Sequence, residues 1–171
     1  MNRRHMLNGL LLASLGLALF ATAAPAQDKK IDPKRIVGHW TLVSVDNVAA
    51  DGTRTQGFGQ NPSGVAIFEP NHRFTVSLLD PDLPKLASGN RNAGTADENK
   101  AVTQRSLFYF GTYRLNHDGT LSLGIEGSSF PNWIHVNQER KISLLTATEV
   151  KWTNPTASVG GTAETTWKRE K

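Results

Sequence analysis

Hydrophobic and polar residues alternate along most of the chain after residue 36, with a repeat of two residues. An alternation of this period is typical of β-strands that bury one face and expose the other. Eight stretches carry it, and they predict strands at residues 38–45, 64–69, 73–79, 106–115, 120–128, 137–146, 148–153 and 163–170. In the first strand, the pattern places Trp40, Leu42 and Ser44 on one face and Val45 on the other.

Turn-forming residues between these stretches predict antiparallel hairpins. Pro-Asn-His at 70–72 separates the second and third strands, and Asn-His-Asp-Gly at 116–119 separates the fourth and fifth. An Asp-Gly pair between two alternating stretches is a strong hairpin signal, because glycine adopts the positive φ that tight turns need. Residues 154–161 (NPTASVGG) predict a flexible hairpin loop before the last strand.

A polar segment at 83–106 interrupts the alternation. Within it, Thr95 and Glu98 have the spacing of a capping box, in which each side chain bonds a backbone N–H of the other residue. The segment therefore predicts a short helix over about 96–105, packed across one end of the barrel that the strands form or lying beside that barrel. Ala101 and Val102 give it only a thin apolar face, and a plain loop is the alternative.

Eight antiparallel strands joined by hairpins predict an all-β fold, an up-and-down barrel with one short helix. At this strand number a closed sheet has room for packed side chains or for one small ligand. Gly38 and Trp40 begin the first strand, and the indole is expected to close one end of the barrel. Closure places the last strand beside the first, so Arg169, or alternatively Lys168, is expected to lie over the Trp40 ring.

A Gly-x-Trp on the first strand, together with a basic residue late in the sheet, resembles the lipocalin and calycin group. Gly38, Trp40 and Arg169 are the matching residues. The sections GHWTLVSV, PSGVAIFEPNHRFTV, FGTYRL and GIEGSSFPNW extend the resemblance, and they are similar to the bacterial and fungal lipocalin-like domain family. The resemblance covers about residues 36–170. It implies the fold, a calycin-like barrel, more firmly than it implies an activity.

The N-terminal segment has the composition of a cleaved secretory signal peptide. Arg3 and Arg4 precede an almost wholly apolar run, and Ala24 and Ala26 occupy the small-residue positions before a cut. The arginine pair fits either an ordinary basic leader or a twin-arginine export signal. A retained membrane anchor is the alternative, but the apolar run is shorter than a membrane-spanning helix requires.

Cleavage after Ala26 defines the expected organisation of the mature chain: a solvated arm at 27–35 and one barrel domain at 36–170. We expect a bacterial protein of the periplasm or the medium, with no membrane span after cleavage. The formal net charge of the whole chain is +4, and it falls to about +2 because the leader carries two arginines and no acidic residue.

The composition of the chain argues against nucleic acid as a partner and excludes disulfide bonds as a source of stability. No basic run is interleaved with aromatic residues, which argues against nucleic-acid binding. The chain contains no cysteine, so its stability must come from burial and backbone pairing and not from disulfides.

Five residues are candidates for binding a ligand inside the barrel. Side-chain parity places Tyr109 and Tyr113 on the apolar face of their strand, and Gln138 and Arg140 on the apolar face of theirs. Trp133 follows a Phe-Pro-Asn corner, where it packs on the rim or forms a wall of the mouth. A buried arginine needs a partner, and for Arg140 both a structural pair and an anion-binding role in the cavity are open.

Glu126, His135 and Tyr113 are the candidates for acid or base chemistry. Glu126 is expected to face solvent or to pair with an arginine, unless Gly127 marks a bulge that turns it inward. No G-x-S-x-G motif occurs. The histidines outside the leader, His39, His72, His117 and His135, show no metal-ligand spacing, so the sequence predicts neither a metal nor a cofactor.

These observations leave three functional hypotheses. The leading one is an exported lipocalin-like barrel that binds a small, largely apolar or amphipathic molecule in its interior. The alternative is a small cofactor-independent enzyme, an isomerase, cyclase or hydrolase, that uses acid and base residues in the barrel cavity. In the third, side chains fill the barrel and the protein works through its surface.

Overall fold

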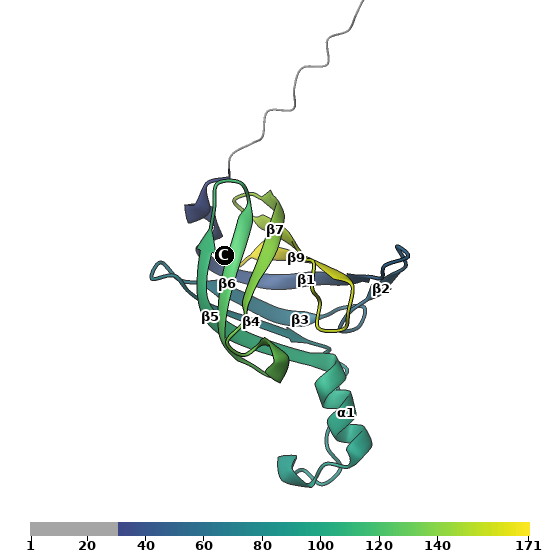
Figure 1. Cartoon of the computed structure of the whole chain (residues 1–171). Helices are drawn as coiled ribbons and strands as arrows, with labels where there is room; N and C mark the ends of the chain where they lie inside the picture. Colours follow the sequence, from purple (N-terminus) through teal and green to yellow (C-terminus); the bar gives the residue numbers. More distant parts are fainter. Residues whose placement is uncertain (1–30) are drawn as a thin grey trace, which may run out of the picture.

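The computed structural model describes residues 31–171 of the chain. The expected signal peptide at 1–26 lies outside these residues, as do residues 27–30 of the expected arm. Figure 1 shows a barrel of strands from which a helix extends. The strands are β1 (Gly38–Val48), β2 (Arg54–Gln56), β3 (Ser63–Phe68), β4 (Arg73–Leu79), β5 (Ser106–Leu115), β6 (Thr120–Ser128), β7 (Asn137–Leu145), β8 (Glu149–Asn154) and β9 (Thr162–Arg169). The helical elements are the α-helix α1 (Ala96–Arg105) and the 3₁₀ turns η1 (Pro33–Ile36), η2 (Arg91–Ala93) and η3 (Pro131–Trp133).

The strands form one antiparallel sheet that closes on itself. Each strand from β3 to β9 pairs with the next, and β1 pairs with both β3 and β9. The predicted eight-stranded closed antiparallel barrel is therefore confirmed, and closure removes the open edges of a flat sheet. β2 is an additional short strand that the alternation did not predict, and it pairs with residues 46–48 of β1 at the barrel rim.

A β-bulge in β1 changes which side chains face the core. Trp40 and Leu42 point inward as predicted, but the ladder with β9 shifts its register between Leu42 and Ser44. The extra residue moves the alternation by one position, and Val45, only 3% exposed, takes the next inward position. The predicted faces of Ser44 and Val45 are therefore wrong, because parity holds only along an uninterrupted ladder.

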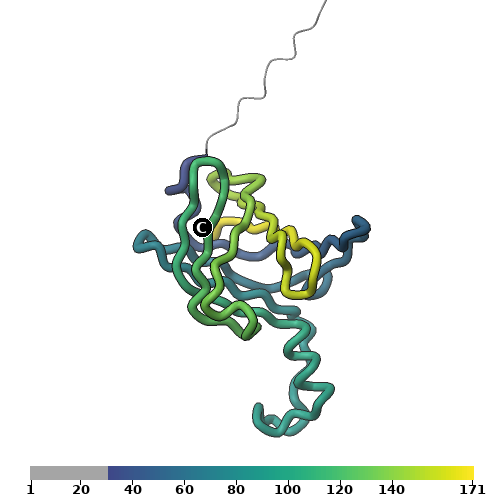
Figure 2. Tube along the Cα trace, in the orientation of Figure 1, coloured from purple at the N-terminus to yellow at the C-terminus, as the bar shows by residue number. Residues whose placement is uncertain are grey.

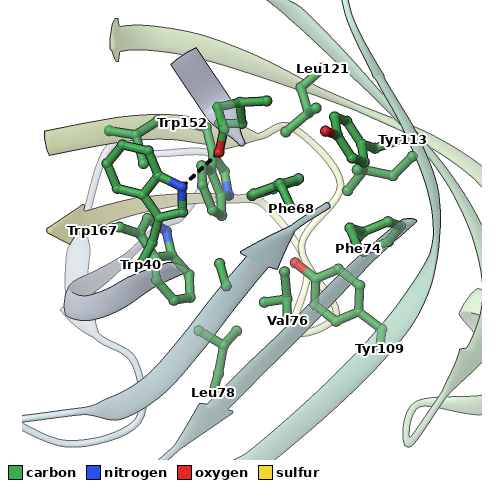
Figure 3. Close-up of a cluster of buried hydrophobic side chains, with 14 of the residues drawn as sticks. Trp40, Phe68, Phe74, Val76, Leu78, Tyr109, Tyr113, Leu121, Trp152 and Trp167 are labelled. Carbon is green, nitrogen blue, oxygen red and sulfur yellow. Dashed lines mark hydrogen bonds between the residues drawn. The ribbon is translucent and has the colours of Figure 1, made fainter. Parts of the chain in front are cut away.

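Aromatic side chains fill the end of the barrel at which β1 begins (Figure 3). Trp152 and Trp167 are stacked with 5.0 Å between ring centroids, and Phe68 meets Trp152 edge-on at 6.1 Å. Trp40 is fully buried, and its Nε1 donates a hydrogen bond of 2.8 Å to the carbonyl of Ile36 in η1. Contacts of this kind add to the burial of apolar area that stabilises the fold.

Arg169 on β9 covers the Trp40 ring at this closed end. Its Cζ atom lies 4.0 Å from the ring centroid, and the two residues are direct partners across β1 and β9. The guanidinium donates hydrogen bonds of 2.8 Å to the carbonyls of Val37 and Ala147. Lys168, the alternative cation, is exposed. The guanidinium therefore ties the last strand to the segment that enters the first.

Gly38 makes room for this arrangement. Its φ of +131° is in the region that side chains rarely adopt, and a Cβ there would lie 2.3 Å from Nη1 of Arg169. Glycine is therefore required for both conformation and space.

Helix α1 forms over the predicted residues, and both hydrogen bonds of the capping box between Thr95 and Glu98 are present. Its predicted position is wrong, because the helix neither crosses the barrel nor lies along its wall (Figure 1). The trace in Figure 2 shows residues 80–105 as an excursion that leaves after β4 and returns at β5. None of the helix side chains is buried, since Ala101 and Val102 offer too narrow an apolar face for packing.

An ion pair holds the base of this excursion together. Nε and Nη2 of Arg105 lie 2.8 and 2.7 Å from Oδ2 of Asp80, and the Asp80 N–H donates to the Arg105 carbonyl at 2.9 Å. The Asp82 N–H donates to the other carboxylate oxygen at 2.9 Å. That backbone bond and then the Arg105 guanidinium lower the pKa of Asp80.

The described part of the expected solvated arm, residues 31–35, is attached to the barrel. The Ile31 N–H donates to the carbonyl of His117 at 3.0 Å, and the Ile31 side chain packs partly buried against the core. Asp32 then caps η1 by accepting the Lys34 N–H at 3.1 Å. This segment therefore covers the closed end beside the turn between β5 and β6.

Candidate ligand-binding site

A cavity of about 70 Å³ lies at the opposite, open end of the barrel. Its residues come from the ends of strands that point away from Gly38, from the last turn of α1 and from the loop between β8 and β9. We call it the mouth cavity, and it is lined by Val45, Asn47, Gly57, Phe58, Leu78, Gln104, Leu107, Tyr109, Trp133, Arg140, Trp152, Asn154, Ala157, Ser158, Val159, Ala163 and Thr165. Figure 3 shows Tyr109 and Leu78 beside the buried aromatic cluster, which fills the barrel beyond the cavity.

Arg140 is the centre of the polar groups in the mouth cavity. It is inward-facing on β7 and only 2% exposed. Its guanidinium donates to the side-chain oxygen of Gln138 and, at 3.1 Å, to the carbonyl of Glu139. Its Cζ lies 5.5 Å from the ring centroid of Trp133, and Trp133 meets the Tyr109 ring edge-on at 5.3 Å. These contacts hold the guanidinium in one orientation against an aromatic face.

Among residues 31–171, no acidic residue lines the mouth cavity, and Arg140 is the one charged residue that does. None of the ion pairs within residues 31–171 includes Arg140. Burial lowers the pKa of Arg140, and the neighbouring Tyr109 hydroxyl opposes that effect. Burial also disfavours the charged form of Tyr109, and it therefore raises the pKa of the Tyr109 hydroxyl. A cation is therefore held in a desolvated place by neutral groups, which is an arrangement that favours an incoming anion.

A wider groove of about 390 Å³ lies outside the mouth cavity. We call it the mouth groove, and its lining includes Phe58, Val102, Gln104, Leu107, Phe130, Pro131, Ser158 and Val159. Phe58, Gln104, Leu107, Ser158 and Val159 line both spaces, so the two adjoin, and we refer to them together as the recess. Within the part of the chain that the structure describes, no charged residue lines the groove. The recess is therefore charged at its inner end and neutral at its outer end.

The structure brings together four of the five residues predicted to bind a ligand. Tyr109, Trp133 and Arg140 line the mouth cavity, and Gln138 lies behind it as a buried partner of Arg140. Tyr113 does not join them. Its hydroxyl donates to the carbonyl of Glu69 at 2.8 Å, in the turn between β3 and β4 at the closed end.

The candidates for acid or base chemistry lie away from the cavity. Glu126 is the extra residue of a bulge in β6, but it stays exposed and forms an ion pair with Arg73 at 2.6 and 2.7 Å. This pairing lowers the pKa of Glu126. His135 is exposed at a positive φ of 61°. Neither side chain lines the mouth cavity.

Residues 31–171 contain neither a cluster of metal-ligating side chains nor a helix that could cross a membrane. In that part of the chain, no group of three or more histidine, aspartate or glutamate residues is arranged to hold a metal ion. Over the same residues, no helix has the length and apolar character needed to span a bilayer.

Sequence reasoning did not predict several residues of the recess. Asn154 and Thr165 are buried polar residues of β8 and β9, and both line the mouth cavity. Their inward parity with Trp152 and Trp167 was the available signal. Phe58 and Gln104 come from the segment after β2 and from α1, and no periodicity marks either as part of a binding site.

The family model described as a lipocalin-like domain matches residues 37–170. No curated protein matches. Among solved structures, the chain is similar to a redesigned β-barrel, with a TM-score of 0.41 and 18% identity over 81% of this chain and 94% of that chain. It is also similar to a de novo designed fluorescence-activating β-barrel, with a TM-score of 0.41 and 12% identity over 81% of this chain and 96% of that chain.

Proposed function

Because the chain belongs to the lipocalin-like domain family, we propose that its barrel binds a small, largely apolar molecule at its open end. The observation that carries the proposal is the recess, in which the mouth cavity and the mouth groove adjoin and share five lining residues. Burial of apolar ligand surface against its aliphatic and aromatic lining supplies the driving force, at about 25 cal/mol per Å².

The dimensions of the recess indicate how such a molecule is held. Ligand pockets in proteins commonly enclose roughly 300–1,000 Å³. The mouth cavity, at about 70 Å³, accepts only one end of a ligand, and the mouth groove, at about 390 Å³, accepts the remainder. The ligand is therefore bound at the mouth, and the aromatic cluster of the closed end stays packed.

The proposal includes export of the protein. The basic, apolar and small-residue sections of residues 1–26 support a cleaved leader. The mature barrel then acts in the periplasm or the medium, where it meets its ligand without a membrane span.

The test is binding of N-phenyl-1-naphthylamine, an uncharged apolar fluorophore, followed by its emission. We expect the wild-type protein to enhance the emission with a saturable dependence on concentration. Ser158→Trp places an indole where the cavity and groove meet, and we expect it to weaken binding by at least about tenfold, a loss of about 1.4 kcal/mol.

Thr148→Trp is the matched control, because it adds the same indole at an exposed turn beside Arg169, at the closed end. It should leave the affinity unchanged. Equal affinities in both variants, or no saturable enhancement in the wild type, would contradict binding in the recess.

A further inference from the structure

We infer that the natural ligand is an amphipathic monocarboxylate that enters the recess head first, so that its carboxylate pairs with Arg140 while its apolar body lies in the mouth groove. This inference rests on the proposed function and adds to it the chemical class and the orientation of the ligand.

The first argument is the missing counter-charge of Arg140. The side chain is 2% exposed, yet no carboxylate in residues 31–171 forms an ion pair with it. Arg105, whose side chain is 33% exposed and so less desolvated than Arg140, does have a carboxylate partner in Asp80. A buried charge is retained at low cost only when an opposite charge and hydrogen bonds compensate it. An anionic ligand would supply that compensation.

The second argument is the orientation of the guanidinium. Two of its contacts are to neutral oxygens, those of Gln138 and the Glu139 carbonyl, and one face lies against Trp133. A guanidinium has five N–H donors in a planar fork. Since Arg140 and its neighbour Tyr109 both line the mouth cavity, a planar carboxylate bound there would meet the guanidinium, whose fork can donate two parallel bonds to it.

The third argument is the gradient of polarity along the recess. The inner end contains Arg140 and the Tyr109 hydroxyl, whereas the outer end is lined by apolar residues such as Phe130 and Val159 and by no charged residue. A ligand in the reverse orientation would leave Arg140 without a counter-charge and would place its apolar end against the guanidinium. Desolvation penalties therefore favour the head-first orientation.

The charge of the site selects among anions. One guanidinium with neutral neighbours balances one negative charge, and the inner space of about 70 Å³ suits a small planar head group. A carboxylate meets both conditions, whereas a phosphate dianion would leave one charge uncompensated in the desolvated site.

The test compares matched ligands on the wild-type protein, so that it does not depend on a variant that folds. Affinities of saturated monocarboxylates from hexanoate to dodecanoate, and of their methyl esters, are measured by calorimetry at about pH 7.5, where the acids are ionised. A charge-assisted bond in a desolvated site should make the acid bind roughly 10- to 100-fold more tightly than its ester.

Variants then assign this preference to one residue. Arg140→Gln should abolish the preference for acid over ester, and Arg140→Lys should retain part of it, since the charge remains but the fork is lost. Arg114→Gln removes the same charge from the exposed face of β5 and is the matched control. Each variant is first compared with the wild type by circular dichroism and thermal unfolding.

Equal binding of acid and ester by the wild type, or an undiminished preference in a folded Arg140→Gln, would overturn the carboxylate inference while leaving an apolar binding function in place. If neither acids, esters nor N-phenyl-1-naphthylamine bind, the proposed function itself is wrong, and the inference falls with it.

Discussion

Single residues at the closed end determine how tightly the first and last strands approach. Gly38 has no Cβ atom, and the guanidinium of Arg169 approaches the space where one would lie. The Cζ atom of Arg169 lies 4.0 Å from the centroid of the Trp40 ring. A substitution at Gly38, Trp40 or Arg169 is therefore expected to disturb the contacts of the other two residues, because all three share one small volume.

Gly38→Ala should destabilise the fold by roughly 1–3 kcal/mol, the cost of a strained backbone position, and by more if Arg169 is displaced from Trp40. The measurement is the free energy of unfolding from urea denaturation. Gly52→Ala is the control, since Gly52 also has a positive φ, of 85°, but nothing lies within 4 Å of its Cβ position. Equal losses in the two variants would show that the contact with Arg169 has no role.

Residue-level prediction from the sequence succeeded where one strand ladder is continuous and failed where it is interrupted. Tyr109 and Arg140 were assigned inward by parity and are inward. Val45 was assigned outward and is inward, because the bulge after Leu42 moves the alternation by one position. A bulge depends on how two distant strands meet, and the sequence of one strand does not contain that information.

At the scale of elements, the excursion between β4 and β5 depends on the pair of Asp80 and Arg105. The helix within it buries no side chain, so its own packing contributes little, and the contacts at its base hold it to the barrel. Its capping box was visible in the sequence, whereas its direction was not, because the direction follows from the long-range pair.

Asp80→Asn should make residues 81–105 more susceptible to protease while the barrel stays folded, because the amide removes the charge that pairs with Arg105. The measurement is the rate of tryptic cleavage within that segment, followed by mass spectrometry. Glu126→Gln, which breaks the exposed pair with Arg73, is the control and should leave that rate unchanged. Unchanged cleavage in Asp80→Asn would contradict the role of the pair.

The same pair predicts a dependence on pH. The pKa of Asp80 is lowered by the Asp82 N–H and by Arg105, so its carboxylate stabilises the folded state fully above its ordinary pKa. That contribution is lost as the pH falls through the lowered pKa. The difference in melting temperature between the wild type and Asp80→Asn should therefore shrink in that acidic range, as followed by circular dichroism. A difference that stays constant through that range would contradict the lowered pKa.

At the scale of the whole molecule, closure brings the ends of many strands into one recess. The mouth cavity takes residues from six strands, β1, β4, β5, β7, β8 and β9, and from four connecting segments. The sequence predicted the barrel, because alternation and turn signals are local. Of the ligand-binding residues that it suggested, the structure brings Tyr109, Trp133 and Arg140 to the cavity, with Gln138 behind them, and their role in binding stays a prediction. It could not predict Phe58 or Ser158, because their positions depend on how the connections fold over the mouth.

Export with cleavage of the leader after Ala26 predicts a defined N-terminus for the mature protein. Protein recovered from the periplasm or the medium should begin at Gln27, because Ala24 and Ala26 supply the small residues before the cut. N-terminal sequencing and intact mass measure this directly. Ala26→Gln should retain the leader on the recovered protein, whereas Ala23→Gln, the same substitution outside those two positions, should not. Full-length protein in the membrane fraction of the wild type would contradict cleavage.

The pairing of Leu79 with Ser106, directly beside Asp80 and Arg105, has a consequence for how this fold can vary. These contacts set the register of β4 against β5 at the point where the chain leaves the barrel after β4 and comes back to it at β5. The length and composition of the intervening segment are thereby uncoupled from the alignment of the strands. Relatives or engineered versions can exchange that segment for a shorter linker or a foreign peptide, and so reshape the rim above the recess without rebuilding the cylinder beneath it.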